Sequence, residues 1–146
     1  MGAEGQKPLW TCPACGQSFV TPHMWHSCVR RTLDDFFKGH EEKRPLYEAF
    51  LALVERFGPV TVNVNKTRIS FQGRVRFAGV AGLRRDGLVC GFWLKRRIQS
   101  PRFSRVEVFP RNDHVYQFRL RHVDELDDEV AGWIEEAARV GQQLGA

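Results

Sequence analysis

The amino-acid sequence predicts an α+β fold, namely an antiparallel β-meander of five to six strands packed by flanking helices, with a small N-terminal zinc-binding module. Apolar residues recur at helical spacing near both ends of the chain and alternate with polar residues along its middle. A Cys-x-x-Cys pair followed by histidine and cysteine lies near the N-terminus. We therefore divide the chain into a disordered lead-in (residues 1–9), the zinc-binding module (residues 10–29) and an α+β domain (residues 30–146).

The composition suits one small domain. Among the 146 residues, 42% are hydrophobic and 12% aromatic, which is enough for a well-packed core. No apolar run approaches the roughly 20 residues of a membrane span, and residues 1–7 lack the apolar stretch of a secretory signal. The lack of such a signal argues for a reducing compartment, where cysteines stay free or bind metal. We therefore expect a cytoplasmic protein and no membrane partner.

Three helices are expected. Thr32 can cap a short helix whose first turn carries two aspartates, and Gly39 is expected to end it. Pro45 is expected to open a second helix, because the missing N–H of proline is not needed in a first turn. That helix ends before Gly58. A last helix is expected over residues 124–144, with acidic side chains crowding its first turns.

The middle of the chain alternates with the period of β-strands. Asp86-Gly87 predicts a tight hairpin, and short connections between the other segments favour antiparallel neighbours. Cys90 falls in an apolar stretch, so we expect its thiol in the core rather than on a metal. The expected strands are residues 60–64, 68–72, 74–77, 88–95, 105–109 and 115–121.

Cysteine and histidine spacing predicts a metal site. Cys12 and Cys15 have the spacing of a zinc knuckle, but zinc takes about four thiolate or imidazole ligands, so two more are needed. Cys28 with either His26 or His23 completes a Cys3His set, and the spacing alone leaves both histidines open. Four protein ligands leave no position for a substrate water, so the zinc is expected to be structural.

The basic charge is concentrated in the middle of the chain. Residues 59–121 carry 14 basic and three acidic side chains, whereas residues 122–146 carry one basic and seven acidic ones. Strand alternation places several arginines and amides on one sheet face, which suits an anionic ligand such as nucleic acid or a nucleotide. The structural alternative is a solvated face that the acidic last helix partly neutralises. The expected ligand-binding residues are Lys66, Arg68, Gln72, Arg74, Arg76, Arg97, Arg102 and Arg119.

No catalytic motif stands out. The sequence has no GxSxG elbow, no Walker loop, no HExxH motif and no GxGxxG after a strand, so we assign no catalytic residue and do not favour an enzyme. Two alternatives to an anion-binding module stay open. One is a protein-interaction module that docks an acidic partner. The other is a small-molecule pocket or enzyme around Lys66, Arg68 and His114.

The order of several motifs resembles an uncharacterised bacterial family, the domain of unknown function numbered fifty-six fifty-five. The resemblance runs from Trp10 to about Gly141. It rests on Cys12-Pro-Ala-Cys15-Gly16, His26-Ser-Cys28, Gly58-Pro-Val60, Lys66-Thr-Arg68-Ile69, Phe71-Gln72, Arg74-Val-Arg-Phe77, Leu94-Lys-Arg-Arg97, Pro101-Arg-Phe103, Phe118-Arg-Leu120 and Asp124-Glu-Leu-Asp127.

This resemblance implies a helix, an antiparallel sheet and a closing helix, and it carries no activity. The His-Ser-Cys triplet belongs to the family pattern, which favours His26 over His23 as the fourth ligand. The stretch from Lys66 to Arg76 matches the most distinctive part of the family. A function shared by the family is therefore expected to involve that stretch.

Overall fold

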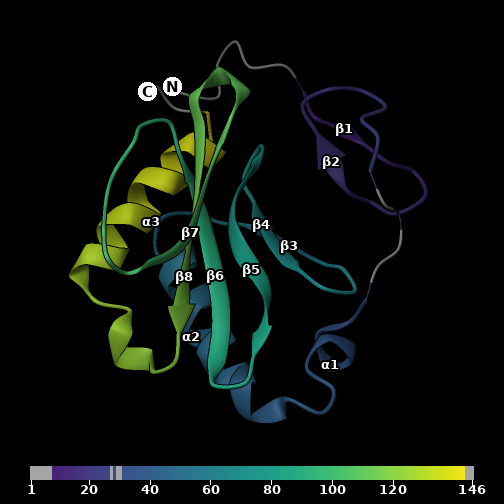
Figure 1. Cartoon of the computed structure of the whole chain (residues 1–146). Coiled ribbons are helices and arrows are strands. Elements are labelled where there is room, and N and C mark those ends of the chain that lie inside the picture. Colours follow the sequence, from purple (N-terminus) through teal and green to yellow (C-terminus); the bar gives the residue numbers. More distant parts are fainter. Residues whose placement is uncertain (1–7, 27, 29–30, 144–146) are drawn as a thin grey trace.

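The computed structural model describes residues 8–26, 28 and 31–143 and shows an α+β domain with a small module beside it (Figure 1). The predicted fold class is confirmed. The module contains a two-stranded antiparallel sheet formed by β1 (Trp10–Thr11) and β2 (Ser18–Phe19). The expected lead-in over residues 1–9 lies, apart from Pro8 and Leu9, outside the described residues.

The first helices begin where the sequence predicts. In α1 (Leu33–Phe36), the Thr32 hydroxyl accepts a hydrogen bond from the Asp35 N–H at 3.0 Å, and the Asp35 carboxylate accepts one from the Thr32 N–H. This capping box satisfies two backbone donors. A short 3-10 turn, η1 (Glu41–Lys43), leads into α2 (Arg44–Glu55), which has its proline in the first turn.

The last helix starts later than predicted. A separate 3-10 turn, η3 (Val123–Glu125), occupies the predicted start of this helix, and α3 (Asp128–Gly141) follows it. The Asp127 carboxylate caps α3 by accepting a hydrogen bond from the Val130 N–H at 3.1 Å. No helix within the described ranges is long and apolar enough to cross a membrane.

Six strands form one sheet in which every neighbouring pair is antiparallel. Their order across the sheet is β3-β4-β5-β6-β8-β7, and a 3-10 turn, η2 (Pro110–Asn112), joins the last two in the chain. The strands are β3 (Thr61–Val64), β4 (Ile69–Gln72), β5 (Arg76–Arg84), β6 (Gly87–Leu94), β7 (Phe103–Phe109) and β8 (Asp113–Leu120).

One connection departs from a simple meander. β6 pairs with β8, so the chain leaving β6 first forms the edge strand β7 and then returns between the two. The buried Tyr116 hydroxyl holds this connection, because it donates to the Arg96 carbonyl at 2.9 Å and accepts from the Ile98 N–H at 2.8 Å. β5 is also longer than predicted, because glycine and alanine in its second half hide the alternation.

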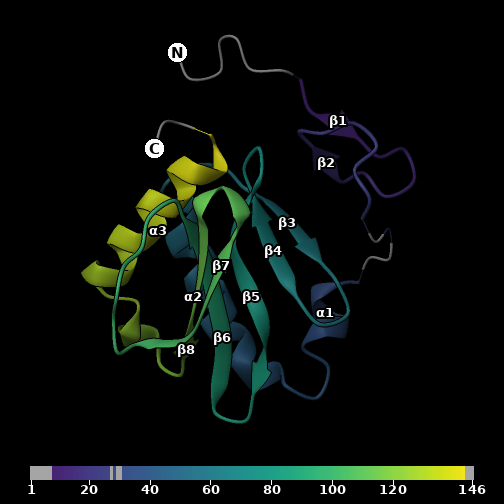
Figure 2. The same cartoon turned by 45° about the horizontal axis from the view of Figure 1, so that its top comes forward.

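The helices α2 and α3 lie together on one face of the sheet, behind the strands in Figures 1 and 2. Aromatic side chains fill the space between these layers. The Phe50 ring lies 5.7 Å from that of Phe71 and 6.0 Å from that of Phe118, and Phe92 stacks on Trp133 at 5.5 Å. Such ring pairs stabilise the fold beyond the contribution of the apolar area that they bury. We call the opposite face, which no helix of the described residues covers, the open face.

The glycine of the predicted hairpin, Gly87, lies where the backbones of β6 and β8 approach each other closely. Gly87 begins β6, and a Cβ at this position would lie 2.2 Å from the Leu120 carbonyl oxygen. We expect Gly87→Ala to lower the free energy of unfolding by about 1–3 kcal/mol, because the backbone of β8 would have to shift. Chemical denaturation followed by circular dichroism measures this change.

Gly132→Ala is the matched control, because Gly132 lies on the exposed side of α3 with no neighbouring atom within 4 Å of an added Cβ. This variant should gain about 0.5–1 kcal/mol from better helix propensity. A Gly87→Ala chain as stable as the wild type would contradict the packing described for β6 and β8.

Candidate functional site

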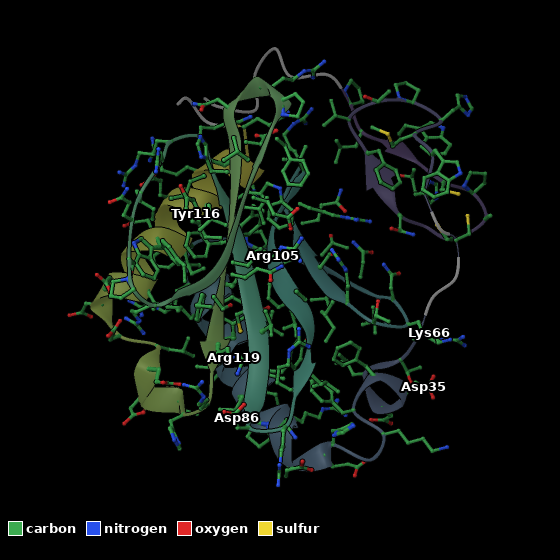
Figure 3. The ribbon with its side chains drawn as sticks, in the orientation of Figure 1. Asp35, Lys66, Asp86, Arg105, Tyr116 and Arg119 are labelled. Carbon is green, nitrogen blue, oxygen red and sulfur yellow. The ribbon has the colours of Figure 1, made fainter. Side chains whose placement is uncertain are left out.

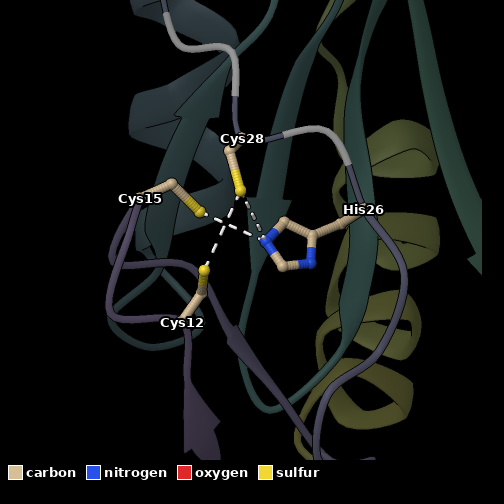
Figure 4. Close-up of side chains that lie close together, drawn as sticks. All are labelled: Cys12, Cys15, His26 and Cys28. Atoms are coloured by element: carbon tan, nitrogen blue, oxygen red, sulfur yellow. Dashed lines mark hydrogen bonds between the residues drawn. The ribbon is translucent and has the colours of Figure 1, made fainter.

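Four side chains of the N-terminal module converge on one point (Figure 4). The ligand atoms of Cys12, Cys15, His26 and Cys28 all lie within 4.8 Å of one another. The Cys12 and Cys28 sulfurs are 3.9 Å apart, and His26 Nε2 lies 3.3 Å from the Cys15 sulfur and 3.5 Å from that of Cys28. A tetrahedral site with Zn–S bonds of about 2.3 Å would hold its sulfurs ~3.8 Å apart. The four residues therefore form a group that can hold a metal ion.

Local hydrogen bonds build this group. The Gly16 N–H donates to the Cys12 carbonyl at 2.8 Å, and Gly16 has a φ of 78°, which favours glycine. The His26 Nδ1–H donates to the Met24 carbonyl at 2.6 Å. This bond directs Nε2, without its proton, toward the sulfurs. The Phe19 ring lies against the His26 ring, with centroids 4.6 Å apart.

The thiols change one another's pKa. Burial opposes ionisation of Cys15, but hydrogen bonds from the backbone and side chain of Gln17 and from His26 lower its pKa to about 6. Backbone hydrogen bonds, chiefly from Cys15, lower the pKa of Cys12. The hydrogen bond with Cys12 is the main cause that raises the pKa of Cys28 to about 11. A dication between these three thiols would favour the thiolate form of each.

His23 lies outside the group. It is exposed, has a φ of 58°, and its ring packs on Trp10 with centroids 4.9 Å apart. The structure therefore brings His26 and not His23 to the three cysteines. Cys90 is fully buried in β6, and burial raises the pKa of its thiol, in agreement with the core position predicted for it.

Amide side chains attach the module to the sheet. The Gln72 Nε2 donates to the Ser18 carbonyl of β2 and, at 3.2 Å, to the Arg74 carbonyl. Its Oε1 accepts from Asn63 Nδ2 at 3.2 Å. Gln72, one of the predicted ligand-binding residues, is therefore buried and holds β2 against β4.

A cleft of about 630 Å³ lies between the module and the sheet, and we call it the junction cleft. The module contributes apolar side chains to it, including Trp25, which is 89% exposed. The sheet and the β7–β8 turn contribute three arginines. The residues that matter here are Phe19, Met24, Trp25, Arg74, Arg76 and Arg111.

Arg76 carries a charge that the described chain does not neutralise. Burial, with a smaller contribution from the charge of Arg68, lowers the pKa of its guanidinium. One of its Nη atoms donates to Gln17 Oε1 at 3.4 Å, whereas its Nε is buried and has no hydrogen-bond partner among the described residues. No described carboxylate forms an ion pair with it. A buried donor is unfavourable unless it finds an acceptor, and an anion would supply both an acceptor and a counter-charge.

The other predicted ligand-binding residues are spread over the domain. Arg74 lines the junction cleft, and its Nε donates to Gln143 Oε1 at 2.9 Å. Figure 3 shows Lys66 at the β3–β4 turn, at one edge of the sheet, and Arg119 on β8, toward the other edge. Arg68 lies on the open face, and Arg97 is exposed in the β6–β7 connection. These residues do not form a single basic patch.

Acidic side chains of the last helix neutralise part of the basic charge, as the structural alternative predicts. Arg102 donates to the Asp127 carboxylate at 2.9 Å and to that of Glu129 at 3.1 Å. Arg96 binds both carboxylate oxygens of Glu136 at 2.8 Å. Arg102 therefore holds the start of α3, and nothing places it near the junction cleft.

The sequence did not point to Met24, Trp25 or Arg111 as cleft residues. Trp25 had one indication, since it directly precedes the candidate metal ligand His26. Arg111 is brought to the cleft by the β7–β8 turn, where it has a φ of 69°. No local pattern in the sequence predicts that approach.

Comparison with protein families agrees with the resemblance noted from the sequence. The family described as domain of unknown function (DUF5655) matches residues 33–139. That range contains the helices and the six-stranded sheet and begins after the cysteine module, so a family pattern extending back to Trp10 stays a prediction. No curated protein and no solved structure gives a match. The chain belongs to the DUF5655 family and carries a Cys3His group ahead of the family domain.

Proposed function

We propose that this chain is a zinc-stabilised binding module whose junction cleft takes a phosphate-bearing ligand, with single-stranded nucleic acid as the expected one. Three thiolates and one imidazole are donors that zinc accepts in closed, structural sites. Cys12, Cys15, His26 and Cys28 would hold it. Because four protein donors leave no position for water, its contribution is to fix the loop that carries Trp25, with no part in a reaction.

The buried and unpaired Nε of Arg76 is the observation that carries the ligand proposal. A phosphate oxygen would give this donor an acceptor and give the guanidinium a counter-charge. Arginine suits this task because its planar fork binds phosphate oxygens in pairs. Arg74 and Arg111 line the same cleft and would extend the contact along a phosphate backbone.

Trp25 supports a nucleic acid rather than a small inorganic anion. Its ring is 89% exposed and borders the cleft that the arginines line. Bases of a single strand stack on such rings, which contributes about 1–3 kcal/mol per base. The proposed binding site for the anionic ligand is therefore the junction cleft and not the strand face expected from the sequence. Three of the residues predicted from the sequence, Gln72, Arg74 and Arg76, line this cleft.

An acidic protein partner is the second candidate. Met24 and Trp25 are 43% and 89% exposed and lie next to the cleft arginines. An exposed aromatic anchor beside basic side chains is also typical of a protein-docking site. Competition between an acidic peptide and an oligonucleotide separates the two candidates.

The metal site is tested with cobalt(II) as a spectroscopic probe. We expect the full chain to take up one equivalent and to show the absorption of cobalt bound to thiolate. Because His26 Nε2 faces the sulfurs, His26→Ala should weaken binding by more than the roughly 10–100-fold that loss of an outer-shell partner costs. His23→Ala is the matched control and should bind as the wild type does. Equal binding by both variants would contradict the assignment.

Ligand binding is tested by fluorescence anisotropy with a labelled single-stranded oligonucleotide. We expect Arg76→Gln, which keeps an amide beside Gln17, to weaken binding by about 1.5–3 kcal/mol because a charged hydrogen bond is lost. The affinity of the wild type should fall steeply with salt, and each lost phosphate contact should reduce the slope by about 0.7.

Arg85→Glu serves as the control for this measurement, since Arg85 is exposed at the β5–β6 turn, which lies at the other end of the strands from the module (Figure 1). It should leave binding nearly unchanged, whereas Arg111→Glu should weaken it. If neither cleft variant alters the affinity while both stay folded, the junction cleft is not the binding site. An acidic peptide that displaces the oligonucleotide and binds more tightly would favour the second candidate.

A further inference from the structure

A second hollow lies on the open face, away from the module. Its floor is formed where Gly79 of β5 lies directly opposite Gly91 of β6, so that neither of these two positions carries a side chain. The polar and aromatic side chains around it come from the β3–β4 turn and from the strands β4, β6, β7 and β8. They are Arg68, Ser70, Trp93, Glu107, Phe109 and Gln117.

The two glycines of the floor differ in what the fold requires of them. A Cβ on Gly79 would lie 2.3 Å from the Ile69 carbonyl oxygen, so the pairing of β4 with β5 requires glycine there. A Cβ on Gly91 would meet nothing closer than the Tyr116 carbonyl oxygen at 3.5 Å, which is ordinary van der Waals contact. Gly91 also has no positive φ. Neither packing nor backbone conformation explains a glycine at this position.

Glycine within a strand weakens the strand, and it often marks a place where a ligand approaches the backbone. The hollow above Gly91 encloses about 100 Å³. An apolar cavity of about 150 Å³ holds one benzene molecule, so this hollow has room for a single ring that stays partly in solvent.

The walls of the hollow carry polar groups that the described chain does not use. Ser70 is buried and Gln117 is half-buried, and neither side chain forms a hydrogen bond with a described residue. Arg68 likewise pairs with no described carboxylate, whereas the Glu107 carboxylate pairs with Arg105 at 3.1 Å. Trp93 adds an indole ring beside these groups.

We infer that this hollow binds a single nitrogen-heteroaromatic ring of the kind found in nucleobases. The backbone at Gly91 lets the ring lie deep in the hollow, and the Trp93 indole provides an apolar surface for stacking. The amide of Gln117 and the hydroxyl of Ser70 supply both donors and acceptors to the ring edge. Arg68 favours a ring whose exposed edge carries acceptors. The site is separate from the junction cleft and requires no phosphate.

Nuclear magnetic resonance titration of the full chain with free nucleosides tests this inference. Nucleosides lack phosphate, so they separate the hollow from the junction cleft. We expect the amide resonances of Gly79, Gly91 and Gln117 and the indole N–H of Trp93 to shift on addition of at least one nucleoside. Gly91→Ala places a methyl group in the floor and should weaken binding by at least about tenfold, as one methylene does in a fitted pocket.

Gly132→Ala makes the same chemical change on the exposed side of α3 and should bind as the wild type does. Gln117→Leu, which keeps the side-chain volume and removes the hydrogen-bonding groups, should also weaken binding, and it serves as the test if Gly91→Ala fails to fold. The inference is overturned if no nucleoside shifts the floor resonances, or if the folded Gly91→Ala or Gln117→Leu chain binds like the wild type. Binding only of nucleotides, with shifts confined to Arg74, Arg76 and Trp25, would overturn it and leave the proposed cleft function standing.

Discussion

The convergence of three sulfurs and one imidazole on a single point is the interaction on which the proposed ligand-binding cleft depends. β1 and β2 have two residues each, too few to form a stable sheet by themselves. Cys12, Cys15 and Cys28 bring three ionisable thiols together, and ionisation of the first two opposes that of the third, because the pKa of Cys12 and Cys15 is lowered whereas that of Cys28 is raised. A metal ion removes this conflict, and its binding free energy would then order the module.

The module matters because it forms one wall of the junction cleft. Its attachment to the sheet is polar: the Gln72 amide bonds to the Ser18 carbonyl and to Asn63, with Arg76 reaching Gln17 beside them. Buried polar contacts of this kind specify one arrangement only when every partner is in place. Ordering of the module and formation of the cleft are therefore coupled, and the unpaired Nε of Arg76 lies where the two meet.

Local chemistry could be predicted from the sequence because its cause lies within a few residues. The Thr32 capping box, the proline at the start of α2 and the ligand spacing of the cysteines all belong to this class. Features that depend on partners far away in the sequence could not be predicted in this way. Gln72 alternates like a surface residue, yet it is buried because β2, more than 50 positions earlier in the chain, packs over it. β8 lies between β6 and β7, and the Tyr116 hydroxyl that bonds to the β6–β7 connection has its acceptor 20 positions away in the chain. The role of Gly91 also needed the structure, since the sequence cannot show which glycines the backbone requires.

The most direct test of this account is oligonucleotide binding by the chain before and after removal of its metal with a chelator, with circular dichroism recorded on both samples. If the metal builds a wall of the cleft, removal should abolish binding, leave the spectrum of the six-stranded domain in place, and be reversed by adding zinc. A metal-free chain that binds with unchanged affinity would contradict the account, because the cleft would then form without the Cys3His group.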